Sequence, residues 1–295
     1  MISILFFCCL LHAANLSAQD GRLESEYKLY VPPSDVEDIW TYVQNSYGQQ
    51  EFVINGQSLT GTQSVETFID NYFDSDDRQL AVDEVSLRHR KRFKDGQLLK
   101  QLVQLKLPYS TDKVIRNEIK FDVAKLKNGD KLYAGHPLLK LLNNSDKERM
   151  QYHLASYQLR IEQLRPELKF RQHRRRVYIS DDAGESVATI TLDQVTHFSM
   201  PFLTFAELEL ELNEIKYTSA NADERAYMEA LNESMKTHLS EKFPDLKVDQ
   251  RSKYNKMLIL EDESSLSNLW HNSIWFFFVA VTFSALFLYI KDQFS

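Results

Sequence analysis

Cysteine is almost absent from this sequence of 295 residues, and the only two, Cys8 and Cys9, stand within the first ten positions. The chain beyond them has no thiol, which excludes disulfide bonds, a cysteine nucleophile and cysteine-ligated zinc there. Glycine (8) and proline (7) are also scarce. Long flexible linkers are therefore not expected, and most of the chain should be regular structure.

Charge of one sign is concentrated locally, although the whole chain is mildly acidic with a formal net charge of −7. The acidity argues against a general nucleic-acid coat, and no specific nucleic-acid partner is expected. Residues 86–106 nevertheless carry seven basic residues against one acid, and residues 165–178 carry six against one. Positive charge this dense predicts a polyanionic ligand.

The N-terminus begins with an apolar run, Ile2 to Leu11, that gives way to small and polar residues near Ala18. This pattern is typical of a secretory signal peptide and predicts one at residues 1–18. The alternative for the same run is a buried N-terminal strand.

The C-terminus contains the longest apolar run, residues 269–290, which would span about 33 Å as a helix. It predicts a single transmembrane helix, followed by a short tail at 291–295. With an N-terminal leader, the expected arrangement is a single-pass type I membrane protein. Its soluble domain, residues 19–262, would lie outside the cytoplasm.

Strand-like segments with one charged face dominate that domain, because alternate residues of a strand point to the same side. Six segments show such rows: Glu24, Glu26 and Lys28; Arg88, Arg90 and Arg92; Gln104 and Lys106; Arg116 and Glu118; Lys169, Arg171, His173 and Arg175; Glu207, Glu209 and Glu211. Each row alone is typical of the solvated face of an antiparallel sheet. Six together favour a wide antiparallel barrel with a charged interior.

Helical patterns separate these strands. Capping boxes predict helices at about 35–46, after Ser34, and from Ser145 onward. A third helix is expected over 222–243, before Pro244, and a short fourth around Lys253.

Familiar catalytic motifs are missing: the sequence has no P-loop, no G-x-S-x-G, no H-E-x-x-H and no dinucleotide-binding fingerprint. The groups that remain are carboxylates, which suit a hard cation, and Lys and Arg, which suit phosphate.

The order of the rows resembles the CYTH, or triphosphate tunnel metalloenzyme, superfamily. The E-x-E-x-K opening corresponds to residues 24–28, and N-Y-F-D-S at 71–75 followed by S-L-R-H-R at 86–90 resembles the family's next block. L-K at 105–106, R-x-E at 116–118, I-T-L-D at 190–193, E-L-E-L-E at 207–211 and S-K-Y at 252–254 resemble its later strands and last helix. Arg175-x-x-Tyr178 also resembles the VTC-like polyphosphate-polymerase branch.

The resemblance implies an α+β fold: an eight-stranded antiparallel β-barrel, the triphosphate tunnel, with flanking helices. It implies phosphate binding by Lys28, Arg88, Arg90, Lys106, Arg116, Arg175 and Lys253. Lys169 or Arg171 are the alternatives to Arg175. It implies Mg²⁺ or Mn²⁺ on Glu24, Glu26, Glu118, Glu209 and Glu211, with Glu24 and Glu26 as catalytic residues.

Three functions stay open at this point. The first is a metal-dependent hydrolase of tripolyphosphate, polyphosphate or a nucleoside or organic triphosphate. The second is a VTC-like polyphosphate polymerase, from whose pattern Thr189 departs where an arginine is usual. The third is a membrane-tethered polyanion-binding module, which is favoured by Lys120 in a slot where hydrolytic members often have a second acid.

Overall fold

A computed structural model of the chain describes residues 21–109, 114–123 and 136–265. The chain divides into one compact unit that ends at Tyr254 and a second that begins at Asn255. The predicted signal peptide (1–18) and membrane span (269–290) lie outside the described residues. Within the described ranges, no helix combines the length and the apolar character needed to cross a membrane.

Strands outnumber helices in the order of elements along the chain. They are β1 (Arg22–Val31), η1 (Pro33–Asp35), α2 (Val36–Tyr47), β2 (Phe52–Ile54), β3 (Gln57–Asp74), α3 (Gln79–Val82), β4 (Ser86–Lys94), β5 (Gln97–Pro108), β6 (Ile115–Asp122), α4 (Asn144–Ala155), η2 (Ile161–Gln163), β7 (Arg165–Ser180), β8 (Ser186–His197), β9 (Thr204–Leu212), α5 (Glu214–Ser219), α6 (Ala222–Lys242) and β10 (Lys247–Val248). Residues 253–265 are also helical.

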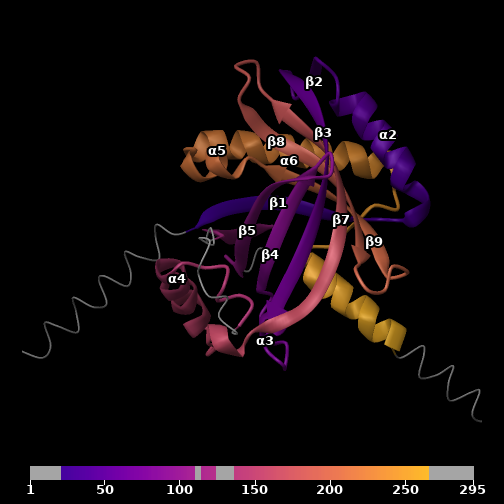
Figure 1. Cartoon of the computed structure of the whole chain (residues 1–295). Helices are drawn as coiled ribbons and strands as arrows, with labels where there is room; N and C mark the ends of the chain where they lie inside the picture. The colour runs from indigo at the N-terminus through magenta and orange to yellow at the C-terminus, as the bar shows by residue number, and fades with distance from the viewer. Residues whose placement is uncertain (1–20, 110–113, 124–135, 266–295) are drawn as a thin grey trace, which may run out of the picture. The chain divides into compact units, whose positions relative to one another are not determined.

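Eight of the strands close into a ring, in the order β1-β6-β5-β4-β3-β7-β8-β9, and β9 pairs back onto β1. Every pairing in the ring is antiparallel. Strand β1 makes the closure possible because its first half, from Arg22 to Ser25, pairs with β6, and its second half, from Glu26 to Val31, pairs with β9. The predicted eight-stranded antiparallel barrel is confirmed (Figure 1).

The wall of this barrel is apolar on the outside and charged on the inside. On β1, Glu24, Glu26 and Lys28 line the interior cavity, whereas Leu29 and Val31 belong to an apolar core packed against helices. The alternation of the sequence produces this division directly, since neighbouring strand residues point to opposite faces. The usual rule of apolar inside and polar outside is therefore reversed for this wall.

Helices cover two parts of the outer surface and bury two apolar cores. The first core joins β1, β7, β8 and β9 to α2 and α6, through residues such as Val177, Ile190, Trp40 and Met235. The second joins β4, β5 and β6 to α4, through residues such as Leu105 and Met150. The hydrophobic stabilisation of the barrel therefore comes from outside its ring.

The helix ends differ in part from the predictions. The helix expected at 222–243 is α6, and its capping box is made by Asn221 and Glu224. Helix α4 is capped by Asn143, which accepts a hydrogen bond from the Asp146 amide, rather than by Ser145. Helix α2 starts at Val36 without a side-chain cap, because the Ser34 hydroxyl donates to Asp35 instead.

Gly61 is where β3 passes closest to the end of α2. A Cβ atom at this position would lie 1.8 Å from the carbonyl oxygen of Tyr47. Both atoms belong to regular elements of the backbone, so neither side can yield without moving an element.

Gly61→Ala should therefore destabilise the full-length chain by more than about 2 kcal/mol, with a fall in Tm of at least about 4 °C. Thermal denaturation in detergent would measure the change. Thr60→Ala, at the exposed neighbouring position, is the matched control and should shift Tm far less. A Gly61→Ala variant as stable as the control would show that the close approach is not present.

Candidate active site

The barrel encloses a cavity of about 410 Å³ to which all eight strands of the ring contribute side chains. Eleven basic and six acidic side chains line it. A cavity with this excess of cations is suited to a ligand that carries several negative charges.

Most of the predicted site residues meet in this cavity. Ten of the twelve line it: Glu24, Glu26, Lys28, Arg88, Arg90, Lys106, Glu118, Glu209, Glu211 and Lys253. They come from β1, β4, β5, β6, β9 and the start of the last helix, so residues 229 positions apart in the sequence share one space. Arg175 and Arg116 are the two exceptions.

Arg175 points to the outer side of the barrel wall, so the expectation that it binds phosphate in the tunnel is wrong. The sequence prediction chose the wrong one of the two alternating faces of β7. Its guanidinium donates two hydrogen bonds to the Glu37 carboxylate, at 2.7 and 3.0 Å, and lies over the Trp40 ring. Arg175 shares its outward phase with Val177 and Ile179, which pack into the apolar core. The alternatives Lys169 and Arg171 have the same phase and also lie outside the cavity.

Arg116 is buried but does not line the cavity, which corrects the expectation that it binds phosphate. Its guanidinium donates to the backbone carbonyls of Glu84 (3.0 Å) and Gln250 (3.4 Å). It therefore joins β6 to two neighbouring segments of the chain.

The cavity also contains charged residues that sequence reasoning missed. Arg92, Lys100, Lys120, Arg174, Arg176 and Glu214 line it, and Asp70, Asp193 and Glu207 are buried directly behind the lining. Arg174 and Arg176 had a usable signal, because they alternate with Val177 and Ile179 and must face away from the apolar core. Glu207 also had a signal, since it alternates with Glu209 and Glu211, and Asp193 ends the I-T-L-D segment. Asp70 had none, because it stands alone between apolar and uncharged residues of its strand.

Most cations of the cavity are paired with carboxylates. Arg90 forms a bidentate pair with Asp70 (2.8 and 2.6 Å). Burial alone would raise the pKa of Asp70, but the positive charges of Arg90 and Arg88 outweigh it and lower that pKa. Arg174 forms a bidentate pair with Asp193 (2.7 and 2.5 Å) and also reaches Glu209 at 2.7 Å. Pairing of this kind is what allows charged groups to be buried at all.

Two cations among the described lining residues have no carboxylate partner. Arg176 donates to the hydroxyls of Thr191 and Tyr178, each at 3.1 Å. Lys100 is exposed on β5, opposite Arg92 in register. These two side chains can accept an anionic ligand without first giving up an ion pair.

The acids of β1 differ sharply in protonation. Burial and repulsion from Glu26 raise the pKa of Glu24 to about 8, although Lys106 lies 2.6 Å from its Oε2 atom. For Glu26, burial is outweighed by Lys28 and Lys106, and its pKa falls to about 2. Glu24 therefore holds a proton at neutral pH while its neighbour stays ionised.

Glu211 lies directly opposite Glu26 in the β1–β9 pairing. Burial raises the pKa of Glu211, although Arg176 opposes the shift. Within the part of the chain that the structure describes, the side-chain carboxylate of Glu211 makes no hydrogen bond or ion pair. Burial thus raises the pKa of two acids, Glu24 and Glu211, on this side of the cavity.

Glu118 has lysine partners instead. Lys120 lies 2.7 Å from its Oε2 atom and also binds the Glu214 carboxylate at 2.6 and 2.8 Å. Burial is outweighed by Lys106 and Lys120, so the pKa of Glu118 is lowered. Like Glu26, which pairs with Lys28, Glu118 is thus neutralised by lysine side chains.

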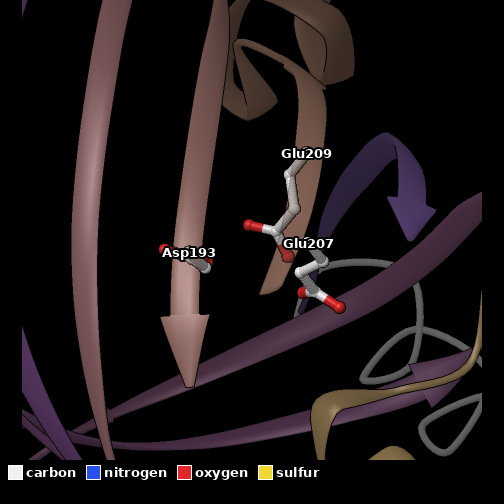
Figure 2. Close-up of side chains that lie close together, drawn as sticks. All are labelled: Asp193, Glu207 and Glu209. Atoms are coloured by element: carbon white, nitrogen blue, oxygen red, sulfur yellow. The ribbon is translucent and has the colours of Figure 1, made fainter. Parts of the chain in front are cut away.

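A separate group of carboxylates, Asp193, Glu207 and Glu209, lies close enough together to share a cation (Figure 2). The Lys253 ammonium already occupies the position between them, 3.0 Å from Asp193 and 2.5 Å from Glu209, with an ion pair to Glu207. Burial is outweighed by these acids, and the pKa of Lys253 is raised well above its usual value. An internal lysine, rather than a free site, balances this group.

A family model for the CYTH domain matches residues 23–241, which cover the whole barrel and most of α6. The chain belongs to the CYTH family. The resemblance in the sequence and the closed charged tunnel thus agree. No curated protein matches the chain.

Solved structures with a related fold include a protein from Pyrococcus horikoshii, 18% identical, which covers 81% of this chain and 99% of its own with a TM-score of 0.47. A candidate adenylate cyclase from Bacillus halodurans is 15% identical, and the match covers 80% of this chain and 97% of that protein, with a TM-score of 0.46. A candidate adenylyl cyclase from Hippeastrum, described with a dominant triphosphatase activity, is 14% identical. The match covers 79% of this chain and 93% of that protein, with a TM-score of 0.44. These likenesses are too weak to carry a functional argument, which rests on the tunnel itself.

Glu24 gives the CYTH tunnel a measurable pH dependence. Its folded pKa of about 8 is above the unfolded value of 4.5, so the stability that its proton provides is present below pH 4.5 and lost as pH rises through 8. Glu24→Gln should therefore be more stable than the wild type at pH 9 by on the order of 1 to 3 kcal/mol, and nearly equal at pH 5.

Denaturant titrations of the full-length chain with EDTA would measure this difference. Glu26→Gln is the matched control of opposite sign, because a folded pKa of about 2 means that ionised Glu26 stabilises the fold above pH 4.5. Two variants with the same pH profile would contradict the assignment of the proton to Glu24.

Proposed function

We propose that this chain is a membrane-anchored phosphohydrolase that cleaves linear triphosphate or polyphosphate with the help of a divalent cation. The observation that carries the proposal is the closed antiparallel tunnel lined by eleven basic side chains. Guanidinium and ammonium groups bind phosphate oxygens strongly, and a linear phosphate chain fits a narrow cavity that presents them from several sides.

Phosphate binding begins at Arg176 and Lys100, which have no carboxylate partner to release. Deeper in the tunnel, Arg88 donates to Gln104 and to the Tyr72 hydroxyl, at 3.0 and 3.1 Å, and lies 3.6 Å from Asp70. The two neutral partners hold its guanidinium in place, and Asp70 compensates its charge only from a distance beyond a hydrogen bond.

The residues that fit a divalent cation are Glu24, Glu26 and Glu211. Hard cations such as Mg²⁺ and Mn²⁺ prefer carboxylate oxygens. Burial is the largest cause of the raised pKa values of Glu24 and Glu211, and repulsion from Glu26 adds to it, so a bound cation would offset both effects. Asp193, Glu207 and Glu209 do not fit, because Lys253 and Arg174 already neutralise them.

The cation, when bound, would neutralise charge on the phosphate chain and lower the pKa of an attacking water. Glu24 is protonated at neutral pH, and a cation bound beside it would favour loss of that proton. The ionised carboxylate could then orient the attacking water and accept its proton. The water oxygen bonds to phosphorus, the phosphoanhydride P–O bond breaks, and the released phosphate keeps the bond electrons. Lys28 holds Glu26 ionised beside this step.

The proposed membrane attachment rests on the two apolar ends of the sequence. Residues 1–18 are removed as a signal peptide, residues 269–290 anchor the chain, and the tunnel faces away from the cytoplasm. Protease added to intact cells should degrade the tunnel domain. Full protection, with the chain still in the membrane fraction, would overturn this topology and would favour the polyphosphate polymerase, which needs a nucleotide donor.

A binding module without turnover is the second candidate, and Lys120 is the observation in its favour. Its ammonium joins Glu118 to Glu214 and so removes one carboxylate from cation binding. Release of phosphate from tripolyphosphate, with Mn²⁺ or Mg²⁺ and then with EDTA, separates the two functions. ATP-dependent growth of polyphosphate would identify a polymerase instead.

Glu24→Gln should abolish cation-dependent phosphate release while leaving tripolyphosphate affinity within about threefold, because glutamine keeps the shape but cannot accept the proton. Glu241→Gln, an exposed position on α6, is the matched control and should retain full activity. A Glu24→Gln variant that still hydrolyses tripolyphosphate would show that another group takes the proton.

Arg176→Gln should weaken tripolyphosphate binding about 10- to 100-fold, the cost of one charge-assisted hydrogen bond. Arg171→Gln is the control on the same strand, since its exposed side chain faces outward and should not affect tripolyphosphate. Isothermal titration of both variants tests the assignment, and equal losses would mean that binding is a diffuse surface effect.

A further inference from the structure

The outward row of β7 is basic, although the ligand proposed above is bound inside. Lys169, Arg171 and His173 point away from the cavity and are half-buried or exposed. Among the described residues, no carboxylate pairs with Lys169 or Arg171. The tunnel does not use this positive charge.

The row continues across neighbouring strands. Ile69 of β3 pairs in register with Arg171 on one side and with Lys91 of β4 on the other. Strands of a sheet lie about 4.8 Å apart, so Lys91 and Arg171 are about 10 Å apart on the same outer surface. Lys91 likewise has no carboxylate partner among the described residues. We call Lys91, Lys169, Arg171 and His173 the outer basic face.

Uncharged hydrogen-bonding side chains fill the spaces of this face. Asn71 lies beside Lys169, Thr67 beside His173, and Thr196 beside Arg171. In the part of the chain that the structure describes, the acids near the two ends of the β7 row are already paired: Glu37 of α2 with Arg175, and Glu167 with Arg78. In Figure 1 strands β4, β3 and β7 lie side by side with no helix drawn over them.

The β4–β5 hairpin joins the outer basic face to the tunnel. Arg92 and Lys100 lie opposite each other in register and line the cavity, and Lys100 is exposed. Lys94 is exposed at the end of β4, and Lys91, one residue before Arg92, points outward. Cations therefore run from the mouth of the tunnel over this rim to the outer wall.

We propose that the outer basic face binds the part of a long linear polyphosphate chain that extends beyond the tunnel. The proposal rests on the proposed function, because one chain is held at both places. The face offers cations and amide or hydroxyl donors, which suit a linear phosphate polymer. Base stacking by a nucleic acid is less favoured, because the Lys169 ammonium already covers the exposed Phe198 ring at 3.6 Å. Binding at two linked places raises the apparent affinity for long chains over short ones.

The test compares tripolyphosphate with a long-chain polyphosphate of defined length on the full-length protein in detergent. The double variant Lys91→Gln/Arg171→Gln should lower the affinity for the long chain by about tenfold. It should also reduce the slope of log K against log salt by about one to two. Its tripolyphosphate affinity should stay within twofold, because the short chain does not leave the tunnel.

Lys242→Gln/Lys247→Gln removes the same charge from exposed positions on α6 and β10 and is the matched control. An equal loss in this control, or no loss in the outer-face variant, overturns the proposal. Single-stranded RNA that binds the wild type as tightly as polyphosphate, with the same dependence on Lys91 and Arg171, also overturns it in favour of a nucleic-acid surface.

Failure of the tunnel function gives a different result. In that case the wild type would not bind tripolyphosphate at all, whereas long-chain binding would still depend on Lys91 and Arg171. Loss of the outer face alone would leave tripolyphosphate binding and its dependence on Arg176 intact.

Discussion

Repulsion between like charges in a confined space is the constraint on which this structure depends. The barrel interior holds rows of arginine and lysine beside rows of glutamate, and a closed wall keeps most of them from water. Such an interior is stable only when opposite charges meet, as in the bidentate pairs of Arg90 with Asp70 and of Arg174 with Asp193. The ion pairs are thus a condition for folding as well as for ligand binding.

The same constraint explains why the apolar cores lie outside the ring. A charged interior contributes little hydrophobic stabilisation, so the outward residues of the strands must bury their surface against helices. Helices α2 and α6 cover one part of the wall, and α4 covers another. The stretch of β4, β3 and β7 around Lys91 and Arg171 belongs to neither core and carries mostly polar and basic residues on its outer side.

Much of this could be predicted from sequence. The alternation of charge identified Glu24, Glu26, Lys28, Arg88 and Arg90 as one-faced rows, and the barrel follows from how many rows there are. The phase of β7 could not be read from charge alone, because both of its faces are basic there. Only the apolar pair Val177 and Ile179 distinguishes them, and it marks the outward side because α2 covers it.

Ion-pair partners were the other gap. Asp70 and Arg90 stand twenty positions apart, and their contact depends on the pairing of β3 with β4. Arg116 has the right spacing from Glu118 for a tunnel residue, yet two backbone carbonyls bind its guanidinium. Tertiary contacts decide such cases, and residue spacing within one strand does not contain them.

Closure of the ring through β1 has a consequence for the order of synthesis. Glu26 and Glu211 face each other across the β1–β9 pairing but are 185 positions apart in the chain. The second half of β1 therefore cannot pair with β9 until nearly three quarters of the polypeptide has been synthesised. Contacts of such long range form slowly. The barrel matures only after its last strand emerges, and until then its charged inner face is open to solvent.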